Sequence, residues 1–236
     1  FSVDFQVGAL QYALVDMTAN GGMGDVVNRN NVLIPFATEK ITAVQHANGR
    51  DFWVLGHEWN SDRFHTWLIS DTGLNITPVI SEVGTVQQGS TVTSIGYMKF
   101  APSGQQLALA SYSTANFVEI YDFDLSSGSV SNPIKLTDFG GLGPYGIEFS
   151  PNGGFLYISE AQGARTKVYQ VELPTTGGKI ADQGVVLTEG SGFGALQLAL
   201  NGKIYHSDDG ELQLHVIHKP DEKGALAEYE KNAQDL

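Results

Sequence analysis

The chain has 236 residues, of which 42% are hydrophobic and 17% charged, so it is long enough to bury the core of one large domain. Its 13 Lys and Arg against 26 Asp and Glu give a net charge of −13, which repels nucleic-acid phosphates and anionic lipid. There is no Cys, which excludes disulfides and zinc–thiolate sites, and no apolar run approaches the ~20 residues that a spanning helix needs. We therefore expect neither a nucleic-acid partner nor direct membrane insertion.

Five stretches of the chain share one pattern: a strand of alternating character, a polar turn and a shorter strand. They begin at Leu10, Phe64, Asn116, Lys167 and Leu212. Alternation with a period of two residues buries every second side chain against a neighbouring sheet. The pattern predicts the outer strand pairs of five repeated units.

A second repeated phrase precedes the later pairs, in which an apolar run meets a Pro/Asn/Ser-Gly turn and is followed by another β-prone run. Its turn glycines, Gly104, Gly153 and Gly202, stand at a constant spacing of 49 residues. A looser copy starts at Thr42 and turns at His-Ala-Asn-Gly (46–49), one residue shorter. A period near 50 with several strands per unit is typical of β-propeller blades.

The predicted fold is therefore an all-β propeller of four-stranded antiparallel blades, with about five blades in this chain as part of a six- to seven-bladed ring. Residues 1–236 form one domain, whose units run roughly over 1–36, 41–86, 94–138, 144–188 and 194–236. The first unit lacks an innermost strand, and the chain starts without an initiator Met or signal peptide. We therefore expect further blades or domains upstream. The tail from Asp221 is assigned to the outer strand of the last unit.

The inner strands of a propeller line its central channel, where propeller hydrolases gather metal ligands. Alignment on the turn glycines places four residues at equivalent inner-strand positions: Gln45, Lys99, Glu148 and Gln197. One carboxylate, one ammonium and two amides predict a structural lining, with Lys99 close to Glu148 because opposite charges attract in a narrow channel. We accordingly assign no catalytic, cofactor-binding or metal-binding residue and expect no cofactor.

Three of the six histidines, His46, His57 and His65, fall in one unit. A four-residue turn at 60–63 pairs Glu58 with His65 and directs His57 and His65 to opposite faces. We predict a cross-strand polar pair of Glu58 and His65 and no zinc site.

The second group is His206, His215 and His218. A turn at Asp208–Glu211 pairs His206 with Gln213, so that His206 and His215 again lie on opposite faces. The carboxylates of that turn have the ligand type for calcium, but Asp-Gly is the commonest hairpin signal, so a plain turn is favoured. Asp122 and Asp124 are expected on a solvated outer strand.

Aromatic residues crowd the hairpin that contains the first three histidines. Trp59 and Phe64 flank its predicted turn and are expected at an exposed loop tip. Exposed aromatics at a rim contact carbohydrates or proteins, so these two residues are the candidate ligand contacts, with inter-blade packing as the alternative.

Five motifs together resemble the propeller-like N-terminal region of large Bacteroidetes surface proteins that are exported by the type IX secretion system and associated with gliding motility. The motifs span residues 15–26, 38–59, 95–104, 144–153 and 214–224. The resemblance covers the whole chain and implies a secreted or cell-surface protein. Two features depart from the pattern: Ala-Leu-Ala (225–227) stands where members often carry a Cys, and no sorting domain is present. The family has no established catalytic residues in this region.

These observations favour a non-catalytic extracellular binding or adhesion module with a carbohydrate or surface-protein partner. The alternative is a propeller hydrolase or lactonase with a metal site in the central channel, to which upstream blades would contribute ligands. Propellers serve both purposes, so the fold does not decide between them.

Overall fold

The computed structural model describes residues 8–141, 143–161, 166–191, 194–208 and 212–235. Strands account for 60% of the chain and helices for 7%, which confirms the predicted all-β class. None of the helices in the described ranges is long and apolar enough to cross a membrane.

The described strands form four sheets in chain order. The first sheet contains β1 (Gly8–Asp16), β2 (Asp25–Gln45), β3 (Phe52–Glu58), β4 (Ser61–Ser70), β5 (Gly73–Leu74) and β6 (Val79–Gln87). The second contains β7 (Met98–Phe100), β8 (Gln106–Ser111), β9 (Phe117–Asp124) and β10 (Ser129–Thr137), with β14 (Gly178–Lys179) added in parallel to β10. The third contains β11 (Gly143–Phe149), β12 (Phe155–Ala161), β13 (Thr166–Glu172) and β15 (Gly184–Ser191). The fourth contains β16 (Leu196–Leu198), β17 (Ile204–His206), β18 (Gln213–Ile217) and β19 (Tyr229–Asp235).

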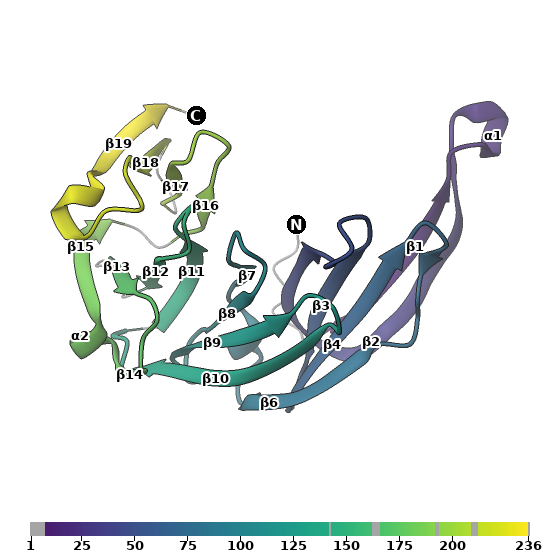
Figure 1. The fold of residues 1–236 in the computed structure, drawn as a ribbon, viewed down its shortest axis with the longest axis horizontal. Coiled ribbons are helices and arrows are strands. Elements are labelled where there is room, and N and C mark those ends of the chain that lie inside the picture. The colour runs from purple at the N-terminus through teal and green to yellow at the C-terminus, as the bar shows by residue number, and fades with distance from the viewer. Residues whose placement is uncertain (1–7, 142, 162–165, 192–193, 209–211, 236) are drawn as a thin grey trace.

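The four sheets lie side by side along an open arc, with the short strands β7 and β16 toward its concave side and β6 and β10 on its convex side (Figure 1). Short helices occupy turns and connections: α1 (Ala19–Gly22), η1 (Thr91–Ser94), α2 (Ile180–Gln183) and η2 (Gly224–Ala227). Within each sheet the main strands are antiparallel neighbours in sequence, which is the connectivity of a propeller blade.

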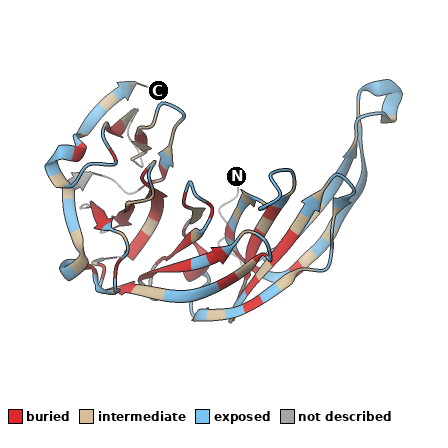
Figure 2. Ribbon diagram, in the orientation of Figure 1, coloured by how far each residue is buried: buried red, intermediate tan, exposed pale blue. Residues whose placement is uncertain are grey.

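The sheets pack face to face through alternating side chains. Leu107 and Leu109 of β8 lie in the core between the first and second sheets, whereas Ala108 and Ala110 of the same strand lie in the core between the second and third. Leu196 belongs to a third cluster of buried hydrophobic residues, which lies between the third and fourth sheets. Figure 2 shows the buried residues concentrated in the middle of the arc. Alternate residues of a strand therefore enter two different cores, one on each face of the sheet.

The three repeated glycine turns connect the first two strands of the second, third and fourth sheets. Gly104, Gly153 and Gly202 have φ values of 73°, 73° and 76°, and each N–H donates to the carbonyl three residues earlier. This left-handed conformation favours glycine, since it has no Cβ. The constant spacing of 49 residues thus marks the same turn in three successive blades.

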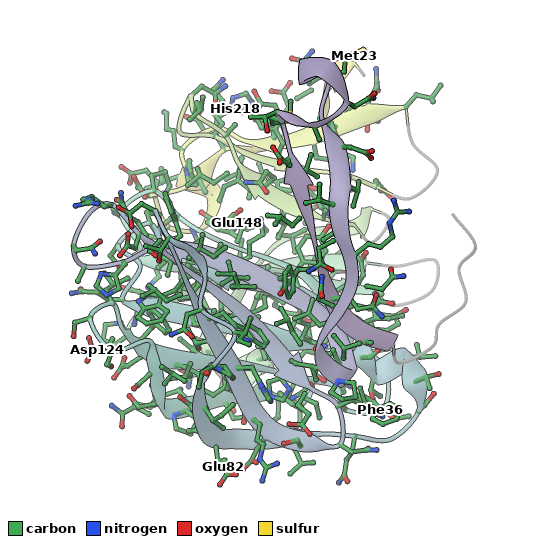
Figure 3. All side chains as sticks on the ribbon, turned by 90° about the vertical axis from the view of Figure 1, so that its right-hand side faces the viewer. Met23, Phe36, Glu82, Asp124, Glu148 and His218 are labelled. Carbon is green, nitrogen blue, oxygen red and sulfur yellow. The ribbon has the colours of Figure 1, made fainter. Side chains whose placement is uncertain are left out.

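The expected separate first unit is wrong, because residues of β1 and β2 belong to the first sheet. Strand β2 pairs with β1 along its first half and with β3 along its second half. The register shifts between Ala37 and Ile41, so residues 38–40 form a bulge where β2 changes partner. Its first half and β1 make a hairpin that extends beyond the other strands, with Met23 at its tip (Figure 3). The described residues therefore form four blade-like sheets.

The assignment of the C-terminal tail is confirmed. Strand β19 pairs antiparallel with β18 and closes the outer edge of the fourth sheet. The helical potential of 225–231 is reduced to the single turn of η2, which ends at Glu228 in a left-handed conformation.

Candidate active site on the concave side

Three inner strands bring polar side chains together on the concave side of the arc. The Nζ atom of Lys99 on β7 lies 3.1 Å from Oε2 of Glu148 on β11 and donates a hydrogen bond of 2.7 Å to Oε1 of Gln197 on β16. The predicted proximity of Lys99 and Glu148 is confirmed by this distance. Equivalent positions of neighbouring blades meet because the inner strands start from equivalent turns.

Glu148 is the fixed member of this cluster and is only 4% exposed. Its Oε2 also accepts from the backbone N–H of Leu198 at 2.9 Å, and its Oε1 accepts from the N–H of Phe149 at 3.0 Å. Both carboxylate oxygens are thus satisfied, so Glu148 is held as an anchor for the Lys99 ammonium. An ammonium has three donors, and two of those on Lys99 are used here, which leaves one for a ligand.

Gln45 does not join the cluster. Its side-chain Nε2 donates to the carbonyl of Gly49 at 2.8 Å, within its own exposed turn. That turn is one residue shorter than the others, so the Gly49 carbonyl lies within reach of the Gln45 side-chain amide. The predicted group of four inner-strand side chains is therefore a group of three in the structure.

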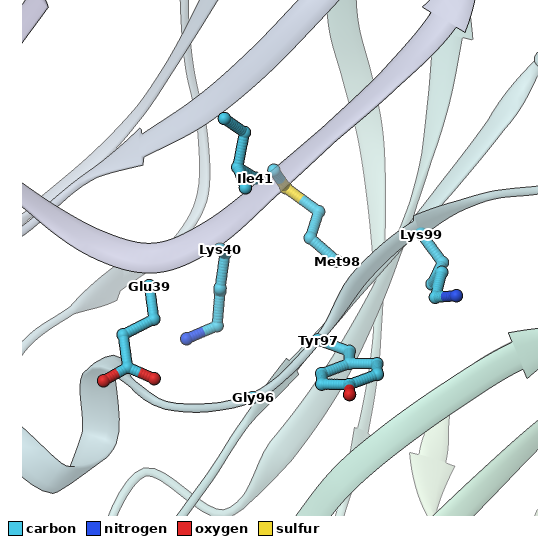
Figure 4. A pocket seen from close by; sticks show the side chains of 7 residues that line it. All are labelled: Glu39, Lys40, Ile41, Gly96, Tyr97, Met98 and Lys99. Atoms are coloured by element: carbon cyan, nitrogen blue, oxygen red, sulfur yellow. The ribbon is translucent and has the colours of Figure 1, made fainter. Parts of the chain in front are cut away.

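A pocket of about 190 Å³ lies next to this cluster, between β2 and β7 (Figure 4). Its lining residues are Glu39, Lys40, Ile41, Gly96, Tyr97, Met98 and Lys99. The bulge at 38–40 exposes the Glu39 side chain and buries that of Lys40. No hydrogen bond or ion pair is made by the Glu39 carboxylate within the described ranges. Sequence reasoning missed Glu39, because no sequence signal marks a bulge inside a long strand.

Lys40 stabilises the floor of the pocket from inside the protein. It is 2% exposed, and its Nζ donates to the carbonyls of Ser94 at 2.7 Å and Ile95 at 3.1 Å. Ser94 is the last residue of η1 and Ile95 follows it, so a cation at this helix end is favourable. Burial lowers the pKa of Lys40 to about 7, and the charge of Glu39 opposes that shift. Lys40 thereby ties β2 of the first sheet to the segment that leads into β7.

Three of the residues that line the pocket carry polar side chains with distinct chemistry: Glu39 with a carboxylate, Tyr97 with a hydroxyl and Lys99 with the anchored ammonium. The Lys99 Nζ also lies 5.7 Å from the centre of the Tyr97 ring. Burial raises the pKa of Tyr97, so this hydroxyl stays protonated as a donor. A carboxylate can accept a proton from water, and a fixed ammonium can stabilise a developing oxyanion.

The Glu58–His65 pair is confirmed, with Nε2 of His65 2.9 Å from Oε2 of Glu58. The register differs from the expected one, because β4 starts at Ser61 and places His57 opposite Phe64. His57 and His65 still project to opposite faces of the sheet.

The expected separation of His206 and His215 is wrong. They are direct partners in the ladder of β17 and β18, and their ring centres are 5.3 Å apart. Nδ1 of His206 is 2.8 Å from the Tyr229 hydroxyl, and Nε2 of His215 is 3.3 Å from Oδ2 of Asp208. The observed register differs from the predicted one by two residues, which brings the two rings directly opposite each other. Their common face follows from alternation alone, since Gln213 and His215 are two residues apart on one strand and lie on the same side of it. Even so, no group of three His, Asp or Glu side chains in the described ranges is arranged to hold a metal ion.

The expected exposure of Trp59 and Phe64 is also wrong. Trp59 is 9% exposed and Phe64 is fully buried in the core between the first two sheets. The turn consists of Trp59 and Asn60, whose N–H groups donate to the carbonyls of Phe36 and Gln87 respectively. Neighbouring strands therefore cover this hairpin end, and inter-blade packing accounts for its aromatic residues.

Where the structure describes them, the acidic residues singled out in the sequence belong to ordinary turns and strands. Asp124 accepts from the N–H and hydroxyl of Ser126, which lowers its pKa to about 2. Asp122 accepts from the Asn132 amide at 2.8 Å. Of the predicted turn at 208–211, only Asp208 lies within the described residues.

No known protein family matches the sequence, and no curated protein matches it either. Solved propeller structures do match. A candidate 6-phosphogluconolactonase of Bacteroides uniformis has a TM-score of 0.61 at 13% identity, over 96% of this chain and 65% of that chain. The Pseudomonas aeruginosa periplasmic gluconolactonase PpgL has a TM-score of 0.52 at 14% identity, over 96% and 63%. A chain of a nidogen–laminin complex has a TM-score of 0.53 at 12% identity, over 89% and 71%.

These likenesses show the fold: the chain is a β-propeller and spans about two thirds of the length of the first of these structures. They also correct the functional expectation. Two of the three proteins carry lactonase names, which contradicts the expected non-catalytic binding or adhesion module and favours the hydrolase alternative.

Proposed function

We propose that this protein is a propeller hydrolase that opens a sugar lactone to the corresponding acid. The observation that carries the proposal is a pocket that has Glu39, Tyr97 and Lys99 among its lining residues. The lactonase names of the two similar propellers support the same reaction class. The hydrolase alternative expected from the sequence had a metal site in the central channel. The described residues do not form such a site, so no step is assigned to a metal.

In the proposed reaction, a water oxygen attacks the lactone carbonyl carbon while the Glu39 carboxylate accepts the water proton. The negative charge that develops on the carbonyl oxygen is stabilised by the Lys99 ammonium, which Glu148 and Gln197 hold in place. The ring carbon–oxygen bond then breaks, and the leaving alkoxide takes the proton from Glu39. The free carboxylate and the anchored ammonium therefore have distinct roles.

The test is to measure the rate of acid release from δ-gluconolactone in the presence of the purified protein. This rate should exceed that of spontaneous hydrolysis. Replacing the base in Glu39→Gln and the oxyanion donor in Lys99→Met should each lower kcat/KM by about 100-fold or more. Glu222→Gln is the matched control, because this exposed carboxylate lies in the connection between β18 and η2, outside the lining of the pocket, and should leave the rate unchanged.

Two results would contradict the proposal. One is a wild-type rate equal to spontaneous hydrolysis for all sugar lactones tried. The other is a Glu39→Gln protein that folds normally and keeps full activity, which would remove Glu39 from the reaction.

We also propose that the protein acts outside the cytoplasm, in the secreted or cell-surface setting that the sequence resemblance implies. The periplasmic location named for the similar P. aeruginosa gluconolactonase supports an extracytoplasmic setting. Immunodetection in fractionated source cells should find the protein in envelope or medium fractions, and detection in the cytoplasmic fraction alone would contradict this.

A further inference from the structure

The hairpin formed by β1 and the first half of β2 is an exposed apolar ribbon. It extends beyond the other strands of the first sheet (Figure 1). Of the nineteen large hydrophobic side chains that are exposed in the described residues, eight lie in this ribbon: Leu14, Val15, Met17, Met23, Val26, Val27, Val32 and Phe36. A two-stranded hairpin by itself is only marginally stable in water, and an apolar surface of this kind marks an interaction site.

The ribbon resembles the outer strand pair of a blade, but its inner neighbour is not among the described strands. The sequence pattern that starts at Leu10 recurs in the strand pairs β4–β6, β9–β10, β13–β15 and β18–β19. In each of these pairs the first strand also pairs with an inner neighbour, which is β3, β8, β12 or β17. Strand β1 has the same place in the pattern, yet within the described ranges it pairs with β2 alone. One edge of β1 is therefore open where its counterparts hold a further strand.

Strand β1 is regular enough to accept another strand. From Gly8 to Asp16 the ladder takes eight steps along β1, and it takes twelve along β2 from Ala37 to Asp25. The four additional residues thus bulge from β2, and no residue of β1 has a positive φ. An extended strand without bulges presents its outward N–H and C=O groups in regular alternation.

The β1 edge also lacks the features that normally block edge-to-edge pairing. Its one charged residue is Asp16, at the end of the strand, and it contains neither Pro nor Lys. The outer edge strand of the fourth sheet, β19, differs because it carries Glu230 and Lys231 near its middle. Pairing through β1 is therefore favoured over pairing through β19.

We propose that the β1 edge pairs with β1 of a second copy of this chain, antiparallel and about a two-fold axis. Such an axis makes one surface its own partner. The register that uses all nine residues of β1 puts Tyr12 on the axis and Leu10 of each copy opposite Leu14 of the other. Asp16 then lies opposite Gly8, so the two Asp16 carboxylates are at opposite ends of the ladder. The product is a four-stranded antiparallel sheet in the order β2–β1–β1–β2, with as many strands as the third and fourth sheets have.

The net charge of −13 does not oppose this contact directly. Residues 8–37 contain two acids, Asp16 and Asp25, and one base, Arg29, so they carry only −1 of that charge. The remaining charges lie outside the ribbon, and salt largely screens exposed charges that are more than about 10 Å apart. The contact is thus made between nearly neutral apolar strands.

Sedimentation velocity over a concentration series is the first test. The sedimenting mass should rise from 25.4 kDa toward twice that value as the concentration increases. Tyr12→Lys places two ammonium groups opposite each other on the axis and should abolish the rise, and Tyr12→Glu should do the same with two carboxylates. An equimolar mixture of the two variants should dimerise again, because opposite charges then meet. A variant that had merely failed to fold would not recover in this way.

The absence of Cys from the chain allows a direct test of the register. Tyr12→Cys should form an intermolecular disulfide under mild oxidation, since directly opposite residues of antiparallel strands lie within disulfide range. Lys231→Cys, at an exposed position of β19, is the matched control and should not cross-link.

Two results would overturn the proposal. A monomer at every concentration would leave the β1 edge to a strand of another sequence. Association that persists undiminished in a folded Tyr12→Lys protein would place the contact between copies elsewhere.

Discussion

Replacing Gly96 with alanine is expected to destabilise the protein by about 4 kcal/mol or more, the sum of backbone strain and a steric clash. Gly96 has a φ of 119°, and a Cβ there would lie 2.4 Å from the carbonyl oxygen of Ala110. The obstacle is backbone of the neighbouring strand, which is held by the hydrogen bond from Ala110 N to Tyr97 O at 2.8 Å. Neither side can move without breaking the start of the inner hairpin.

Urea unfolding measures this loss of stability directly. In thermal unfolding, the same loss should appear as a fall in Tm of roughly 10 °C for a chain of this length. Gly49→Ala is the matched control, because Gly49 also has a positive φ, 71°, but no atom lies within 4 Å of its added Cβ. That change should cost only the left-handed strain, about 1 kcal/mol. Equal losses in the two variants would show that the contact with Ala110 is unimportant. Because Gly96 lines the pocket, the variant should also lose lactone hydrolysis.

The repeat explains why so much of the architecture could be predicted. The turn glycines fix where each inner hairpin begins, and equivalent positions of neighbouring blades then meet. This is how the Lys99–Glu148 contact could be expected from two residues that are 49 positions apart. The same reasoning failed for the first unit, because its residues follow the period only in part and β2 serves two partners.

The errors at the candidate sites come from turn length. Two residues more or fewer in a loop change the register by two, and residue composition does not report that difference. His206 therefore meets His215 instead of Gln213, and Phe64 lies inside β4 instead of at a loop tip. A bulge is equally silent in the sequence, so Glu39 gave no signal.

Acidification from pH 6.5 to pH 4 is expected to destabilise the protein through two buried histidines. Burial, with a smaller contribution from the charge of His215, lowers the pKa of His206 to about 4. Burial and the charge of Lys40 lower the pKa of His57 to about 3. The unfolded chain has histidine pKa values near 6.5 and so binds more protons than the folded protein in this range. Stability therefore falls as the pH falls, by about 3 kcal/mol at pH 4 for each histidine.

Urea unfolding at a series of pH values measures this slope, and replacing one histidine should reduce it. His206→Phe removes the titrating group from the contacts with Tyr229, His215 and Asp208. It lowers stability at neutral pH by losing the bond to Tyr229, yet the further loss on acidification to pH 4 should be about 3 kcal/mol smaller than in the wild type. His46→Gln, at a half-buried histidine in an exposed turn, is the control and should retain the wild-type slope. An identical slope in the wild type and in His206→Phe would mean that His206 is not held in its neutral form by the fold.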